Sequence, residues 1–383
     1  MKKAIETAKE TLLLLKEKEG KRYSHTGSNN DMSTQLENET HFDTEFFQQK
    51  LPHHYRNVLI EFQKISRAFV RFNVLFIGII GAQLASLFIF LPIFSQTSLL
   101  ALGLGTLFLS AFSYLVLLFY YQAKKPEQLN SLLHRFIASC RTAVGLPTGV
   151  AQHHLSIADT LSKLSSYLQD YEWSMGQIPK IFSPLSSLFS RVSAYCYWHD
   201  VFRFKQLLLY AAIDEHLLQI RATPTDLEVH ASLANAYVSL SQIYKEPKGV
   251  DTTHPRQSLY NKHERLFSEK FKTAARLALE EFRILSHYAP QDPWVHDQLA
   301  AGYRDLEMPE EEILEVETLL KLRPQDKDIL FRLGTLYFQQ GLNAKGLQAY
   351  EELQKANFKK AEDLIASYGQ TGEAEMQITP IEV

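Results

Sequence analysis

The sequence has few cysteines, little net charge and no run in which apolar and polar residues alternate. Cys140 and Cys196 are the only cysteines among its 383 residues, which fits a reducing compartment better than a disulfide framework. The formal net charge of −3 indicates no basic surface for nucleic acid. We therefore expect no nucleic-acid partner. Because half-buried strands need alternation and none is found, we expect an all-α protein.

Sequence patterns typical of catalytic or metal sites are also missing. No nucleophile elbow, protein-kinase set or HExxH pair is present. Two pairs of adjacent histidines, at 53–54 and 153–154, point in different directions on a helix, which does not favour a metal site. We therefore expect no enzyme, no cofactor and no metal. The strongest enzymatic alternative is a cluster around His199 and Asp200.

The first 43 residues have the composition of a segment that does not order by itself. Apolar residues recur at helical spacing over residues 4–15, but the apolar run is too short for a signal peptide. A stretch rich in Ser, Thr, Asn and Gln follows. We expect a mostly disordered leader with a short amphipathic helix, and a disordered tail over residues 371–383. Translation can begin at Met1 or at Met32.

Residues 72–123 contain no Lys, Arg, Asp, Glu or His. The apolar segments 72–94 and 99–121 are each long enough to cross a hydrocarbon core of about 30 Å at about 1.5 Å per residue. We therefore expect a transmembrane helical hairpin, with a cytosolic helix over residues 44–71 leading into it. Basic residues flank both segments but not the turn, which predicts cytoplasmic termini. The flanking residues are Arg56, Lys64, Arg67, Arg71, Lys124, Lys125 and Arg135.

The alternative for the hairpin is a buried pair of core helices in a soluble protein. Gly78, Gly81 and Gly105 each lie four residues from an alanine, which favours close helix contacts within the hairpin or in a homodimer. Asn73 and Gln83 are expected to hydrogen bond between the two helices. The hairpin has no ionisable group, so its sequence indicates an anchor and not a transport pathway.

Residues 124–200 are predicted to form a helical linker domain. The segment PEQLNSLLHRFIASCRTAVG from Pro126 places its apolar residues on one helical face. That face can lie along the membrane surface or pack against other helices. Further helical patterns occur around residues 150–172 and 184–220.

The C-terminal part of the sequence repeats itself. PQDPWVHDQLAAGY starts at Pro290, and PQDKDILFRLGTLY starts at Pro324, 34 residues later (324 − 290). The first repeat carries Leu299, Ala300 and Tyr303; the matching residues are Leu333, Gly334 and Tyr337 in the next repeat and Leu233, Ala234 and Tyr237 upstream. Ala278, Phe282 and Pro290 match a second helix.

This pattern resembles the tetratricopeptide repeat family, whose units are helix pairs. The resemblance implies an α-solenoid over residues 201–370 that binds a protein or peptide. Three repeats are recognisable, with a degenerate helix before them and a capping helix after them. The repeat that ends at Pro290 is too long and includes an insertion over residues 244–264. Glu312 occupies a position where a small residue is usual, and Phe358 replaces a final proline.

The resemblance also implies which residues face the groove of the solenoid. The partner-binding residues implied in this way are Trp294, Asp297, Arg304, Phe331 and Phe338. They form an aromatic groove with one Arg, suited to an amphipathic helix. The alternative is that Trp294 and Phe331 only pack between neighbouring helices. The lysine with which some members of the family clamp a chaperone tail is absent, because Ala231 stands at its position.

These expectations combine into a membrane-anchored scaffold that recruits a protein partner on the cytosolic side, in a bacterial inner membrane. An alternative belongs to a different class. The two closely spaced apolar segments also resemble the bilobed domain of bacterial inclusion membrane proteins. That resemblance implies a secreted effector inserted in a host-derived vacuole membrane.

Overall fold

The computed structural model describes residues 44–90, 99–145, 151–175, 186–246, 255–366 and 368. Thirteen helices and no strand lie in these residues, which confirms the predicted all-α class. The chain forms two compact units. One contains the described residues of 42–229 and 242–271, and the other contains those of 230–241 and 272–383. The expected leader, polar turn and tail lie outside the described residues.

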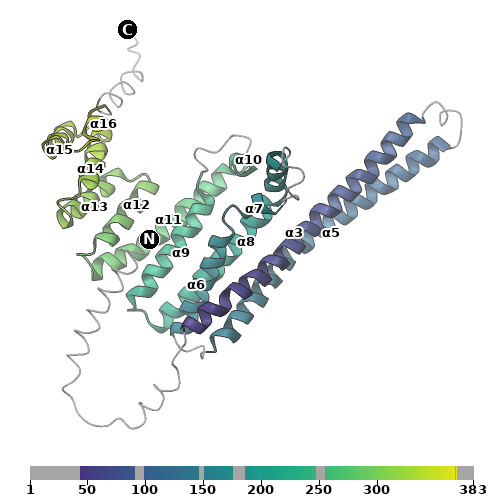
Figure 1. Ribbon diagram of the computed structural model, residues 1–383, viewed down its shortest axis with the longest axis horizontal. Coiled ribbons are helices and arrows are strands. Elements are labelled where there is room, and N and C mark those ends of the chain that lie inside the picture. The colour runs from purple at the N-terminus through teal and green to yellow at the C-terminus, as the bar shows by residue number, and fades with distance from the viewer. Residues whose placement is uncertain are drawn as a thin grey trace, which may run out of the picture. The chain divides into compact units, whose positions relative to one another are not determined.

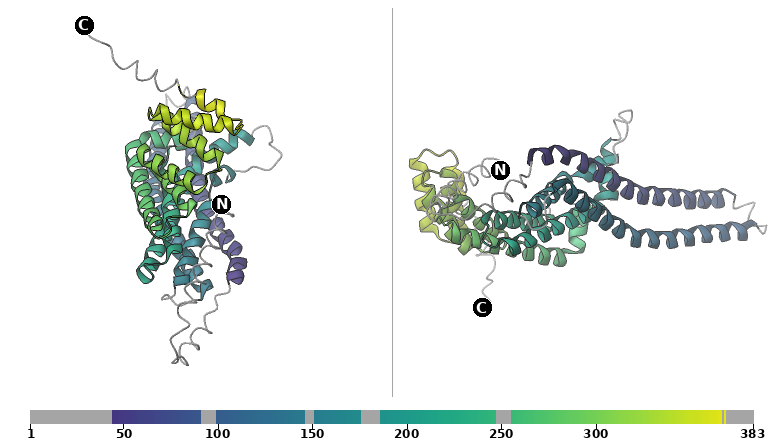
Figure 2. Two further views of the ribbon diagram at one scale, coloured as in Figure 1. Left: turned by 90° about the vertical axis from the view of Figure 1, so that its left-hand side faces the viewer. Right: turned by 90° about the horizontal axis from the view of Figure 1, so that it is seen from below.

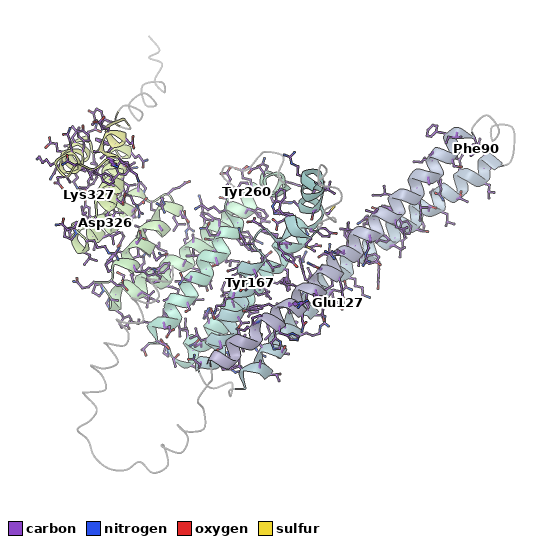
Figure 3. The ribbon with its side chains drawn as sticks, in the orientation of Figure 1. Phe90, Glu127, Tyr167, Tyr260, Asp326 and Lys327 are labelled. Carbon is purple, nitrogen blue, oxygen red and sulfur yellow. The ribbon has the colours of Figure 1, made fainter. Side chains whose placement is uncertain are left out.

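The first unit contains two long antiparallel helices, α3 (Thr44–Ile89) and α5 (Leu99–Val144), which lie side by side along their length (Figures 1 and 2). Their outer halves extend away from the other helices of the unit. Figure 3 labels Phe90 at the outer end of the pair and Glu127 on its inner half. Both helices are long and apolar enough to cross a membrane. The predicted pair of long apolar helices is therefore present.

The apolar surface of these outer halves is not covered by the rest of the described chain. Each helix contains an 18-residue window that is strongly apolar. Of the residues in this window, 6% are buried in α3 and 0% in α5. Phe88, Phe108 and Phe119 are among the most exposed large side chains. A core helix pair of a soluble protein buries such residues, and the described chain does not bury them in α3 and α5.

Polar groups inside the apolar stretch pair with one another across the two helices. Gln83 Nε2 donates to Ser110 Oγ at 2.9 Å, and Tyr114 donates its hydroxyl hydrogen to Asn73 Oδ1 at 3.0 Å. Both expected interhelical hydrogen bonds are thus confirmed. A Cβ added at Gly78, Gly81 or Gly105 would meet nothing within 4 Å. These glycines therefore do not mediate close contacts within the hairpin, and their role in a dimer stays a prediction.

The inner halves of α3 and α5 pack with α6 (Ala151–Tyr167), α7 (Tyr171–Ser174) and α8 (Ser186–Ala222) around one core. The rings of Phe62 and Phe204 stack at its centre with centroids 5.1 Å apart. The unit also contains α10 (Pro255–Lys262). The expected domain boundary between residues 200 and 201 falls inside α8, which continues through it without a break.

An ion pair joins α8 to the hairpin where the apolar stretch ends. Lys125 Nζ lies 2.6 Å from Asp200 Oδ1, and the Asp200 side chain is only 3% exposed. The same ammonium lies 4.2 Å from the centroid of the Phe69 ring on α3. One buried carboxylate therefore connects α8 to the lysine on α5, and that lysine also contacts α3.

Five helices of the second unit form successive antiparallel pairs and a final short helix. They are α12 (Pro293–Asp305), α13 (Pro309–Leu322), α14 (Lys327–Gln339), α15 (Asn343–Lys355) and α16 (Ala361–Ala366). The helices α9 (Leu227–Tyr244) and α11 (Glu264–Tyr288) contribute residues to both units. Small residues allow the close approach of these helices. A Cβ at Gly334 would lie 2.7 Å from a methyl carbon of Leu364.

The Lys125–Asp200 pair predicts a dependence of stability on pH. Burial alone raises the pKa of the Asp200 carboxyl, but the adjacent His199 and the Lys125 ammonium lower it below its usual value. Because the folded pKa is lower than the unfolded value of about 4, the stabilisation is present above that value. It is lost as the pH falls through the folded pKa.

We expect Asp200→Asn to lower the free energy of unfolding by about 3 kcal/mol at pH 7, because the buried Lys125 loses its partner. Between pH 5 and 3 the variant should lose less stability than the wild type. Urea unfolding in detergent micelles measures both effects. Glu351→Gln, in an exposed pair with Lys355, is the matched control and should change stability by less than about 0.5 kcal/mol. Equal acid sensitivity of wild type and Asp200→Asn would contradict this account.

Candidate functional site

The predicted partner-binding residues lie on α12 and α14, which begin in the same way. Asp292 accepts a hydrogen bond from the backbone N–H of Trp294 at 2.9 Å, and Asp326 accepts one from Asp328 at 3.1 Å. Figure 3 labels Asp326 and Lys327 at the start of α14. The repeated PQD therefore has a physical meaning, because its Pro follows the end of one helix and its Asp caps the next.

Trp294 and Phe331 are both half-buried. The Trp294 ring meets the edge of Phe282 on α11 with centroids 5.7 Å apart, and the Phe331 ring lies 6.1 Å from that of Phe358. Each aromatic side chain packs against a neighbouring part of its unit and leaves some of its surface in solvent. Packing between helices accounts for one side of each ring, and the other side remains accessible.

Phe338 lies in the core, contrary to the expectation that it faces the groove. Its side chain is 1% exposed and packs with Leu353 and Leu364. The reason is Gly346 on α15, where an added Cβ would overlap the Phe338 ring. The missing side chain at Gly346 makes room for a phenylalanine that would otherwise have to turn outward.

Asp297 is paired with Arg332, whereas Arg304 has no ion pair among the described residues. Arg332 donates from Nη1 to Asp297 Oδ1 at 3.0 Å and from Nη2 to Glu312 Oε1 at 2.9 Å. Arg304 is exposed, and the described part of the chain offers it no ion pair. Of the two predicted charged residues, only Arg304 has a side chain that can pair with an external group without breaking an internal ion pair.

The same Arg332 explains the unusual residue at the start of α13. Glu312 occupies the position where the repeat normally has a small residue, and its side chain is 4% exposed. A buried carboxylate is costly unless it is paired and hydrogen-bonded. Arg332 from α14 satisfies it, so the departure in the sequence is compensated by a residue of the next helix.

Three partly buried His–Glu pairs were not expected from the sequence. His154 and Glu215, His230 and Glu281, and His296 and Glu315 each bring Nδ1 within 2.6 Å of Oε2. Each histidine is the fourth residue of its helix, α6, α9 or α12. Each glutamate lies three residues after the small-residue position, which is Ala212, Ala278 or Glu312. This common register is the signal that sequence analysis overlooked.

The helices α6 and α8 share the plan of the later helix pairs. Ile157, Ala158 and Leu161 are buried at the positions that Leu299, Ala300 and Tyr303 occupy in α12. Ala212 and Pro224 are spaced like Ala278 and Pro290. Sequence analysis expected only one degenerate helix here and did not recognise α6 as its partner.

His199 and Asp200, the residues of the enzymatic alternative, are neighbours but do not form a close pair. The His199 ring is 63% exposed, its Nδ1 lies 4.0 Å from Asp200, and the carboxylate pairs with Lys125 instead. In the residues that the structure describes, no three His, Cys, Asp or Glu side chains are grouped to hold a metal ion. Burial lowers the pKa of His216 to about 4, which keeps that ring neutral at pH 7.

Comparison with protein-family models and with curated proteins gives no match to the chain. Of the predicted partner-binding residues, Trp294, Arg304 and Phe331 are those that keep some exposed surface and have no ion pair among the described residues.

The Arg332–Glu312 pair yields a second prediction. Arg332→Leu should lower the free energy of unfolding by about 3 kcal/mol, because it leaves Glu312 buried without its cation. Adding Glu312→Ala restores the small residue usual at that position and should recover most of the loss. Urea unfolding of the two single variants and the double variant measures the coupling. Additive losses would show that the two side chains do not depend on each other.

Proposed function

We propose that this chain is a membrane-anchored scaffold, with a helical hairpin in the bilayer and a tetratricopeptide-like solenoid that recruits a protein partner in the cytosol. One observation carries the proposal. A single chain joins an uncovered apolar helix pair to a series of helix pairs built on one plan. The first feature needs lipid, and the second is typical of protein recognition.

The hairpin satisfies the demands that a bilayer makes on a chain. Its backbone is helical throughout the described spans, and its polar side chains at Asn73, Gln83, Ser110 and Tyr114 hydrogen bond to one another. Basic residues flank the two spans and favour a cytoplasmic location for both termini. A bacterial inner membrane with this topology is the localisation that we propose.

We further propose that the repeat array begins at Ala151 and not near residue 201. The pair of α6 and α8 carries the same buried triplet, small residue, His–Glu pair and closing proline as α9 with α11. Four helix pairs then follow one plan, and α16 has the position of a cap. Insertions between α6 and α8, and between α9 and α11, account for the repeats that exceed 34 residues.

The partner surface consists of the accessible sides of Trp294 and Phe331 together with Arg304. Half-buried aromatic residues are well suited to bind an apolar side chain, because packing already fixes their rotamers. The Arg304 guanidinium, which has no ion pair in the part of the chain that the structure describes, favours an acidic group nearby. This chemistry fits an amphipathic helix with an acidic residue on its polar edge.

Site-specific photo-crosslinking in cells tests the surface directly. We expect a photoreactive amino acid at Ala301 on α12 to give a discrete protein adduct, and one at Leu314 on the second helix of that pair to give none. The triple variant Trp294→Ala, Arg304→Ala, Phe331→Ala should reduce the Ala301 adduct at least tenfold. Its thermal unfolding should remain cooperative.

Phe338→Ala serves as the matched control for loss of fold. It removes a core ring, so its unfolding temperature should fall much further than that of the triple variant. A folded triple variant that keeps the full adduct would contradict the proposed surface.

A further inference from the structure

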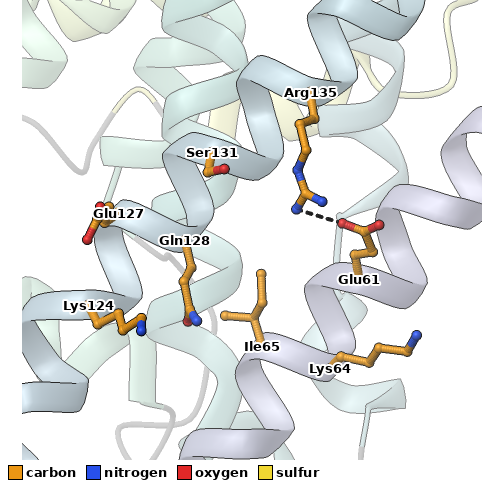
Figure 4. A pocket seen from close by; sticks show the side chains of 8 residues that line it. All are labelled: Glu61, Lys64, Ile65, Lys124, Glu127, Gln128, Ser131 and Arg135. Carbon is orange, nitrogen blue, oxygen red and sulfur yellow. Dashed lines mark ion pairs between the residues drawn. The ribbon is translucent and has the colours of Figure 1, made fainter.

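An open pocket of about 460 Å³ lies between the inner halves of α3 and α5, and Figure 4 shows the side chains that line it. Its lining contains three cations, two carboxylates, two neutral hydrogen-bonding side chains and one apolar side chain. These residues are Lys64, Lys124, Arg135, Glu61, Glu127, Gln128, Ser131 and Ile65. Three positive and two negative charges leave the pocket with one positive charge, 3 − 2 = +1.

The cations in this pocket differ in whether they already pair with an anionic side chain. Arg135 Nη2 lies 2.8 Å from Glu61 Oε2, so these two charges neutralise each other. Lys124 donates to the hydroxyl of Tyr120 at 2.7 Å, which is a neutral partner. For Lys64, the described residues provide no ion pair. Lys64 and Lys124 therefore have charge available for an anion, with Glu127 as the one opposing carboxylate.

The pocket starts where the apolar stretch ends. Lys124 directly follows the last residue of the uncharged segment, at the level where lipid head groups meet the hydrocarbon core. Gln128, Ser131 and Arg135 continue on the same helical face away from the membrane. In the other direction, Tyr120, Leu117 and Val116 lie one to two turns before Lys124 and are exposed. A polar pocket thus continues into an apolar surface.

We propose that this pocket binds the phosphodiester of an anionic membrane lipid whose head group bears hydroxyls, with an acyl chain along the exposed residues of α5. Lys124 and Gln128, whose ends lie side by side in Figure 4, bind oxygens of the phosphodiester. Lys64 points away from them in that view and supplies a second positive charge at the edge of the pocket. Glu127 accepts a hydrogen bond from a head-group hydroxyl. The net charge of +1 matches one phosphodiester. A free phosphate shares the head-group chemistry but makes no use of the apolar surface.

This inference rests on the proposed membrane anchoring, and the test separates the two. The full chain in dodecyl maltoside is mixed with phosphatidylglycerol, phosphatidylcholine or glycerol 1-phosphate. Native mass spectrometry counts retained lipid, and thermal unfolding reports stabilisation. We expect phosphatidylglycerol to be retained and to raise the unfolding temperature, whereas the other two do neither. Lys64→Gln with Lys124→Gln should weaken retention at least tenfold.

Lys262→Gln with Lys272→Gln removes the same charge from exposed positions elsewhere and should leave retention unchanged. Equal retention by the pocket variant, or equal retention of phosphatidylcholine, would overturn the site. Equal stabilisation by glycerol 1-phosphate would overturn the assignment to a lipid. Carbonate extraction of wild-type membranes distinguishes the two failures. If the chain resists extraction but the pocket variant still retains lipid, only the pocket proposal fails.

Discussion

The uncovered apolar surface of α3 and α5 is the constraint on which our account of the protein depends. Each fully exposed Phe, Leu, Ile or Val that moves from water into an apolar environment contributes about 1.5 to 3 kcal/mol. The outer halves carry many of these residues, and the described chain leaves them 39% to 73% exposed. Hydrocarbon would remove this cost, and the pairs Gln83–Ser110 and Asn73–Tyr114 satisfy part of the polar groups there.

The same constraint explains the charged residues that lie next to the apolar stretch. Lys125 lies just after this stretch and joins α8 to the hairpin through Asp200. The His–Glu pairs recur in the same register in α6 with α8, α9 with α11, and α12 with α13. Because the same His–Glu pair occurs in all three helix pairs, we infer that these helix pairs pack in the same way.

The sequence predicts features that depend on local composition and misses those that depend on distant contacts. The two long apolar helices follow from an absence of charge over 52 residues (72 to 123), and the helix pairs from α12 to α15 follow from the repeated stretch. The pairs His154–Glu215 and His230–Glu281 join residues 61 and 51 positions apart, and only their common register in the helix pairs signals them in the sequence. Phe338 was misplaced because the space that receives it belongs to Gly346 on another helix.

The orientation of the hairpin tests the central claim most directly. Alkaline phosphatase, active only outside the cytoplasm, is inserted in the turn between Ser95 and Ser98 or fused after Val383, and each protein is expressed in a bacterium. The account predicts an active enzyme in the turn, an inactive enzyme after Val383, and retention of both proteins in carbonate-washed membranes. Activity after Val383, or release of the protein by carbonate, would contradict it.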